Sequence, residues 1–260
     1  MFTITSAQWM SLLAMWIYPL VRILALLAVV PLFANAALPH RMRLVFGLAL
    51  TVAIAPMLPA PPAGIEPASG AGLLILAQQI MIGIAMGMVM RVTVAAIALT
   101  GELISMQMGL GFATMYDPMS TSQTAVTSEF ISLLATLIFL SMDGHLLLIG
   151  TLVQSFHAMP VMSPPAGVGL FLNVVEWARN IFAYGLLLSL PVVVALIITN
   201  IALSVLSRAA PQLNLMAVGF PITLTVGLVV LGVSLPHLIG PLQRMYADAL
   251  GMMLGIFLGR

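Results

Sequence analysis

Long apolar runs, separated by short polar or Pro/Gly-rich connectors, dominate this chain. A helix needs about 20 mostly apolar residues to cross a bilayer. The candidate stretches are residues 9–33, 44–58, 73–99, 130–152, 181–206 and 215–235. A further apolar tail, residues 238–258, is expected to extend the last of them across a kink at Pro236. The pattern predicts an all-α polytopic membrane protein of about six long apolar helices, including kinked hairpins.

The composition supports this reading. Of 260 residues, 62% are hydrophobic and 6% charged, whereas soluble proteins average roughly 25% charged residues. So few charged residues cannot cover the water-exposed surface of a soluble protein of this length. The chain has no Cys and no Lys, which excludes disulfides, thiolate nucleophiles, Schiff bases and Walker A sites. A net charge of +1 without a run of like charges argues against nucleic-acid binding.

The connectors predict a topology. Residues 59–72 and 159–169 are rich in Pro and Gly and nearly uncharged, so we expect loops outside the cytoplasm. Residues 39–43 and the turn at Arg208 are basic, and the positive-inside rule places both in the cytoplasm. Both termini then lie outside it. Residues 1–8 lack the basic start of a signal peptide, so we expect the first apolar stretch to be retained.

The polar, Gly-rich segment 100–128 lies between two strong apolar stretches. Glycines relax its backbone, and methionine side chains can form a seal that deforms around a passing chain. Irregular backbone at membrane depth is tolerated where it lines a water-filled cavity. We therefore predict a pore plug loop formed by Met106, Met108, Gly109, Gly111, Phe112, Met115 and Asp117. The alternatives are a plain surface connector and, for the methionines, gap-filling in a helix bundle.

Charges inside apolar helices usually pair, snorkel or mark a transport path. The candidates for buried charge pairing, between helices or between subunits, are Arg22, Arg91, Glu102 and Glu129. A proton relay is the alternative, but no two acids form an i, i+4 site.

No enzyme or metal pattern is present. The four histidines, at 40, 145, 157 and 237, lack metal-ligand spacing, and hydrolase, zincin and P-loop motifs are missing. We expect no catalytic activity, no metal and no cofactor.

Two further patterns predict contacts. The stripes Gly83/Gly87 and Gly251/Gly255/Gly259 have the spacing that lets helix backbones approach closely. The turn 208–214 lies between two long apolar helices, where a basic side chain can interact with the last carbonyls of the first helix and a proline restricts the backbone. We predict that Arg208, Pro211, Gln212 and Asn214 contact partner proteins.

The segment 208–227, RAAPQLNLMAVGFPITLTVG, closely resembles the signature of the FliR family, the R subunit of the flagellar protein-export apparatus. Further matching positions run along essentially the whole chain. They are Trp9, Arg22, Pro31, Pro39, Arg41, Arg43, Gly109-Leu110-Gly111-Phe112, Asp117-Pro118 and Gly219-Phe220-Pro221. Injectisome T subunits of type III secretion are the nearest alternative. A stand-alone proton-coupled secondary transporter is the alternative from another class, and we find no internal repeat that would favour it.

The resemblance implies a multi-subunit helical export gate in the bacterial inner membrane, at the flagellar basal body. In that gate the R subunit joins P and Q subunits, next to the A and B export components, and unfolded proteins pass through it. Residues 1–170 are expected to resemble a P subunit and residues 171–260 a Q-subunit helical hairpin. The resemblance also implies a plug-like loop at 106–117 and a gate raised from the bilayer plane, so that apolar helices pack on neighbouring subunits.

Overall fold

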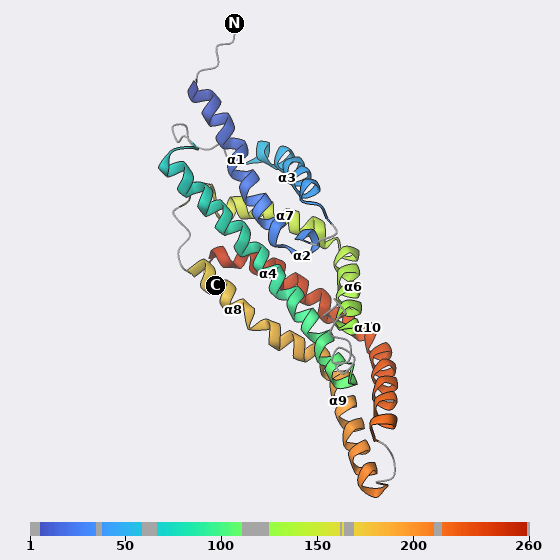
Figure 1. Cartoon of the computed structure of the whole chain (residues 1–260). Coiled ribbons are helices and arrows are strands. Elements are labelled where there is room, and N and C mark those ends of the chain that lie inside the picture. The colour runs from blue at the N-terminus through green and yellow to red at the C-terminus, as the bar shows by residue number, and fades with distance from the viewer. Residues whose placement is uncertain are drawn as a thin grey trace. The chain divides into compact units, whose positions relative to one another are not determined.

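The computed structural model describes residues 6–34, 38–58, 67–110, 125–161, 163, 169–210 and 215–258. Across these ranges the chain is helical and contains no strand (Figure 1). The helices are α1 (Ser6–Val29), α2 (Pro31–Ala34), α3 (His40–Ile54), the short 3-10 helix η1 (Ala55–Met57), α4 (Gly70–Met108), α6 (Val126–Ser141), α7 (Gly144–Ala158), α8 (Gly169–Ala178), α9 (Asn180–Ala209) and α10 (Leu215–Leu258). The prediction of an all-α protein is confirmed.

Within the described ranges, three helices are long and apolar enough to cross a membrane: Gly70–Met108, Gly169–Ala209 and Val218–Phe257. This supports the membrane assignment but not the count of about six. The second predicted stretch became the 15-residue α3, which is shorter than a bilayer requires. The first stretch forms the 24-residue α1, of which Leu13–Val29 counts as a shorter apolar helix. The apolar tail 238–258 joins the stretch before it in the continuous α10, with Pro236 inside the helix.

The fourth predicted stretch is not one straight helix. It is broken between α6 and α7, and the pair bends by 67°. At the break Asp143 has φ 55°, a left-handed conformation that disfavours most side chains. If the bent pair counts as one span, the described chain has up to four.

The chain forms two compact units that interleave along the sequence. The first contains Met1–Val92, Asp143–Ala178 and Ala247–Arg260; the second contains Thr93–Met142 and Arg179–Tyr246. This division does not follow a boundary between residues 170 and 171. The resemblance of residues 1–170 to a P subunit and of residues 171–260 to a Q-subunit helical hairpin stays a prediction.

In the first unit, α4 and α3 both pack against α1 through glycines. A Cβ at Gly83 would lie 2.5 Å from the carbonyl oxygen of Arg22, and one at Gly87 would lie 2.7 Å from the Cβ of Val29. A Cβ at Gly47 of α3 would meet Leu24 at 2.5 Å. The Gly83/Gly87 stripe therefore permits the close approach that its spacing predicts.

The other glycine stripe faces open space within the described chain. A Cβ at Gly251 would meet nothing within 4 Å, and one at Gly255 would have only the sulfur of Met252 at 3.8 Å. Gly259 lies outside the described residues. The same spacing thus has different surroundings on α4 and on α10.

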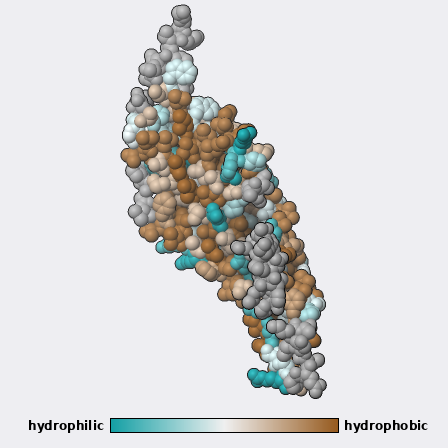
Figure 2. All heavy atoms as spheres, in the orientation of Figure 1, coloured by the Kyte–Doolittle hydropathy of each residue, from teal (hydrophilic) through white to brown (hydrophobic). Residues whose placement is uncertain are grey.

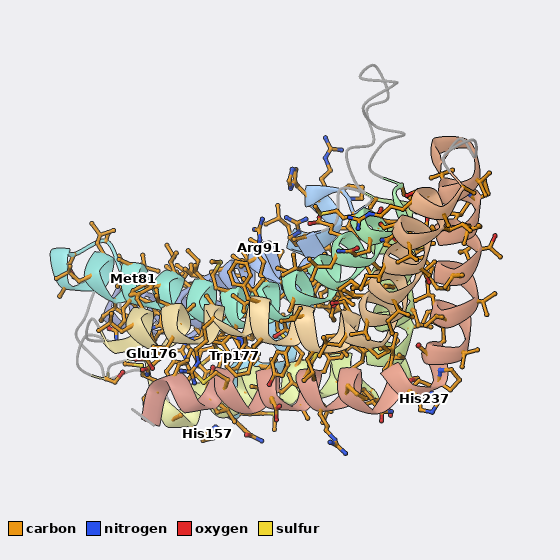
Figure 3. The ribbon with its side chains drawn as sticks, turned by 90° about the horizontal axis from the view of Figure 1, so that it is seen from below. Met81, Arg91, His157, Glu176, Trp177 and His237 are labelled. Atoms are coloured by element: carbon orange, nitrogen blue, oxygen red, sulfur yellow. The ribbon has the colours of Figure 1, made fainter. Side chains whose placement is uncertain are left out.

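Helix α8 also belongs to the first unit. The indole nitrogen of Trp177 donates to the carbonyl oxygen of Val89 on α4 over 3.3 Å, and Figure 3 labels Trp177 on α8, which runs along α4. Asn173 donates to the carbonyl oxygen of Ile256 over 3.3 Å. These bonds attach α8 to α4 and to the last part of α10.

In the second unit, α6 and α9 pack on the C-terminal half of α4. A Cβ at Gly101 would collide with the backbone of Ser128, so only glycine fits at this crossing. Thr127 and Ser128 donate their hydroxyls to carbonyl oxygens of α4 at residues 101 and 98, each over 2.9 Å. On α9, Gly185 faces Leu99, whose side chain a Cβ would approach within 2.8 Å.

Much of the described surface is apolar. Figure 2 shows brown, hydrophobic side chains over most of the visible surface, with only scattered teal ones. On α9 the exposed large side chains include Phe182, Ile198 and Val205, each more than 60% exposed. In the span Gly169–Ala209, only 28% of the most apolar 18-residue stretch is buried inside the chain. In the span Val218–Phe257 the corresponding share is 22%. Such a surface requires lipid or other proteins to cover it.

Candidate functional site

Arg22 is the most deeply buried charged side chain among the described residues and lies in the second half of α1. Its guanidinium donates to Gln79 Oε1 through Nε at 2.8 Å and to the Ser155 carbonyl oxygen at 3.1 Å. It also contacts Ser155 Oγ at 3.3 Å and donates to the Met159 carbonyl oxygen at 2.9 Å. The ring of Phe156 lies 4.1 Å from the guanidinium carbon. The arginine thus joins α1 to α4 and to the end of α7.

The chemistry of these partners explains why an arginine is used. Ser155 and Met159 lie at the C-terminal end of α7, where the carbonyl oxygens carry partial negative charge. The Ser155 carbonyl also accepts the Met159 N–H over 2.9 Å, so Arg22 adds a second donor to it. A planar guanidinium with five N–H groups can satisfy several acceptors at once, and an aromatic ring face attracts its positive charge. The acceptors that the structure gives for Arg22 are neutral.

The predicted buried charge pairing is therefore not found within the described part of this chain. Arg91 and Glu102 on α4, and Glu129 on α6, are exposed; Figure 3 labels Arg91. Only Arg22 is buried, and its acceptors are neutral. The physical reason is that the other three side chains lie on helix faces that no described part of this chain covers. Pairing of these three with other subunits stays a prediction.

The root of the predicted pore plug loop is well defined. Met108, the last residue of α4, is completely buried, whereas Met106 is 72% exposed. Gly109 has φ 82°, a left-handed conformation suited to glycine. The Gly109 N–H donates to the Met106 carbonyl and the Leu110 N–H to the Ser105 carbonyl, each over 3.1 Å. This bond pattern is the Schellman motif, which ends α4 at Gly109.

Met108 is held by α10. Its carbonyl oxygen accepts the Thr223 hydroxyl over 3.3 Å. Its side chain fills the space in front of Gly227, where a Cβ would lie 2.6 Å from Met108 Cγ. Here a methionine fills a gap, as do the buried Met86 and Met90, so gap-filling accounts for part of the methionine-rich segment.

The other plug residues, Gly111, Phe112, Met115 and Asp117, lie outside the described residues. Their sealing role stays a prediction.

Of the predicted partner-contact residues, Arg208 is exposed in the last turn of α9. Pro211, Gln212 and Asn214 lie outside the described residues. The exposure of Arg208 leaves it accessible to a partner, and the contact itself is untested.

Sequence reasoning overlooked several polar contacts. Gln79, Ser155 and Thr223 were not singled out, although each places a hydrogen-bonding side chain in an apolar helix. That signal was available, because a buried polar group in such a helix needs a partner. In the described ranges no group of three or more His, Cys, Asp or Glu side chains could hold a metal ion.

Comparisons with known proteins agree with the sequence signature. A family model described as bacterial export proteins, family 1, matches residues 13–249. The flagellar biosynthetic protein FliR of Escherichia coli K12 is 39% identical over 255 residues, covering 95% of this chain and 97% of that protein. FliR of Pectobacterium carotovorum is 40% identical over 257 residues, covering 96% and 98%. FliR of Aquifex aeolicus is 30% identical over 235 residues, covering 87% of each chain. The chain belongs to the FliR family of bacterial export proteins.

Proposed function

We propose that this chain is the R subunit of a flagellar protein-export gate and forms part of the channel through which unfolded flagellar proteins cross the inner membrane. The observation that carries this proposal is the similarity to flagellar biosynthetic proteins along nearly the whole chain. The three relatives reported above are flagellar, so nothing favours an injectisome T subunit or a stand-alone transporter.

The exposed apolar helices support a role inside an assembly. The spans that end with α9 and α10 are mostly unburied in their most apolar windows, and apolar surface of this extent is covered by lipid or by other subunits. The proposed neighbours are the P and Q export-gate subunits, with the A and B export components next to them. The proposed location is the flagellar basal body in the bacterial inner membrane.

The role is structural and conducting rather than catalytic. The chain carries no nucleophile and base in a recognisable motif. The passing substrates are unfolded proteins in transit, and no cofactor is required.

Purification of the tagged chain in mild detergent, followed by mass analysis of the intact particle, tests the proposal. We expect a defined multi-subunit particle that contains P and Q subunits. A stable monomer that binds a small solute would overturn the gate assignment and favour a transporter.

The loop 106–117 is proposed to close the channel at rest. Support comes from the Schellman motif at Gly109, which ends α4 within the proposed segment, after Met106 and Met108. Deleting residues 109–115 should leave an assembled gate that leaks ions across the inner membrane. If the deleted complex assembles and conducts no more than the intact one, the sealing role is wrong.

The turn 208–214 is proposed as a cytoplasmic contact site for partner export components. Arg208 is exposed at its start. A photocrosslinker at Gln212 should capture an export component in intact cells. Labelling of position 212 only from the periplasmic side would contradict both the contact and the predicted topology.

A further inference from the structure

The contact between Met108 of α4 and Gly227 of α10 depends on the missing side chain of the glycine. A Cβ at residue 227 would lie 2.6 Å from Cγ, 2.9 Å from Cε and 3.0 Å from the sulfur of Met108. Real Cβ atoms do not approach heavy atoms as closely as the first two distances, so any larger residue would displace the methionine. Gly227 therefore leaves a notch on α10, and the fully buried Met108 side chain occupies it.

A second contact to Met108 comes from Thr223, one turn before Gly227 on α10. The Thr223 hydroxyl lies 3.3 Å from the Met108 carbonyl oxygen and 3.1 Å from the Phe220 carbonyl oxygen of its own helix. The last carbonyls of an α-helix lack partners within the helix. Thr223 thus supplies a donor to the end of α4 at the point where the Gly227 notch receives the side chain.

These contacts control where the chain leaves α4. The Schellman bonds make the stretch from Ser105 to Leu110 one rigid cap, so a movement of Met108 carries Gly109 and Leu110 with it. Among the described residues, the contacts of Met108 with α10 include one long hydrogen bond, from a hydroxyl that also faces the Phe220 carbonyl, and one unbranched side chain with three rotatable bonds. The cap can therefore leave α10 without breaking a backbone hydrogen bond of α4.

We propose that Gly227 and Thr223 form a latch on α10 that holds the C-terminal end of α4, through Met108, in the resting position of the gate. The proposal rests on the proposed function, because the latch matters for conduction only if the chain that follows α4 takes part in the seal. It adds that α10 sets the resting state and that release of Met108 precedes opening.

Engineered cysteines test the contact directly, since the natural chain has none. In the double variant Met108→Cys/Gly227→Cys the thiol of residue 108 takes the place of Met108 Cγ, next to the Cβ of residue 227, within reach of a disulfide. Diamide oxidises the two thiols to one disulfide and is itself reduced. In the assembled complex we expect an intrachain bond, detected by mass spectrometry, that stops export of flagellar proteins until dithiothreitol restores it.

The matched control is Met106→Cys/Gly227→Cys, because Met106 is exposed and lies two residues from the latch. This pair should form no bond. Absence of the 108–227 bond in the assembled complex, or undiminished export once it has formed, overturns the latch.

Substitutions test the latch without crosslinking. Gly227→Ala should raise the resting ion conductance of the assembled gate about 10-fold, equivalent to ~1.4 kcal/mol, whereas Gly232→Ala on the same helix should not, since a Cβ there meets nothing within 4 Å. Thr223→Val keeps the side-chain volume but removes the donor, and should raise conductance about 3-fold.

The outcomes separate the latch from the seal. If Gly227→Ala does not assemble, the cysteine pair and Thr223→Val decide. Normal conductance in assembled Gly227→Ala and Thr223→Val, together with a leak after deletion of 109–115, overturns the latch and retains the seal. Normal conductance after the deletion overturns the sealing function itself.

Discussion

The Nε–H of Arg22 points at Oε1 of Gln79 over 2.8 Å, so a charge-assisted hydrogen bond joins α1 to α4 beside their close glycine contact. Gly83, one turn along α4, lies against the carbonyl oxygen of Arg22 itself. Gln79 also donates through Nε2 to the carbonyl oxygen of Val161 over 3.4 Å. The polar bonds and the glycine contact therefore require the same alignment of α1 and α4.

Arg22→Leu should destabilise the subunit by about 3 kcal/mol or more, since hydrogen bonds to a charged group contribute ~1.5–3 kcal/mol each. The substitution leaves Gln79 Oε1 and the Ser155 and Met159 carbonyl oxygens without this donor. Thermal unfolding of the purified complex in mild detergent measures the loss. The amount of the chain in the membrane fraction should fall with it.

Arg22→Lys is the matched variant for charge. An ammonium group lacks the planar fork that reaches acceptors on two helices, so we expect stability between that of the natural chain and Arg22→Leu. If Arg22→Leu is as stable as the natural chain, the network makes no net contribution and the burial of Arg22 needs another explanation.

Gly83→Ala should push α4 away from α1. The new Cβ meets backbone as well as side chain, with the Arg22 carbonyl oxygen at 2.5 Å and the Leu26 nitrogen at 3.0 Å, and backbone cannot move aside as a flexible side chain can. Overpacking of this kind costs about 1–3 kcal/mol, which should lower the unfolding temperature of the purified complex.

Gly150→Ala on α7 is the control, because a Cβ there meets nothing within 4 Å. Alanine favours a helix over glycine by ~1 kcal/mol, so this variant should be unchanged or slightly more stable. If both variants lose the same stability, the close α1–α4 contact is not the reason for a glycine at residue 83.

The two glycine stripes show how far the sequence alone could predict the packing. The spacing of Gly83/Gly87 and of Gly251/Gly255 equally permits close helix contact, but among the described residues only the first pair meets another helix. Small residues indicate that a second helix can approach closely, but they do not identify that helix. The same limit applies to the charges: apolar surroundings predicted burial for four side chains, but burial depends on which face packs inward, and only Arg22 does so.

The helix boundaries were likewise predictable only in part. Apolar length predicted the main helices, because every backbone group in an apolar medium needs a partner and a helix supplies it. The break at Asp143 was not predicted, although Asp143, Gly144 and His145 interrupt the hydrophobic pattern and an Asp-Gly pair is a turn signal. The structure shows the break in the left-handed backbone of Asp143.

Asp143→Gly should preserve or improve stability, whereas Asp143→Val should lower it by about 1–2 kcal/mol. The left-handed conformation disfavours side chains that carry a Cβ, and a β-branched one most. The Asp143 side chain makes no capping hydrogen bond to α7, so glycine loses no cap. Thermal unfolding of both variants in the assembled complex checks the order. A lower stability of the glycine variant would mean that the carboxylate has a role outside this chain's own fold.

Tyr18→Phe should leave the protein at least as stable as the natural chain. Tyr18 lies one turn before Arg22 on α1, is 1% exposed, and its hydroxyl has no hydrogen-bond partner within the described residues. A buried polar group without a partner costs about 1–3 kcal/mol, so removing the oxygen while keeping the ring should stabilise the fold. Tyr18→Ala is the contrasting variant, since loss of the ring leaves a cavity and should cost ~3–5 kcal/mol. Unfolding temperatures of the two purified complexes measure both effects. If Tyr18→Phe lowers the unfolding temperature, the hydroxyl is bonded in the assembled gate, and a neighbouring subunit that donates or accepts there would be the next target for crosslinking.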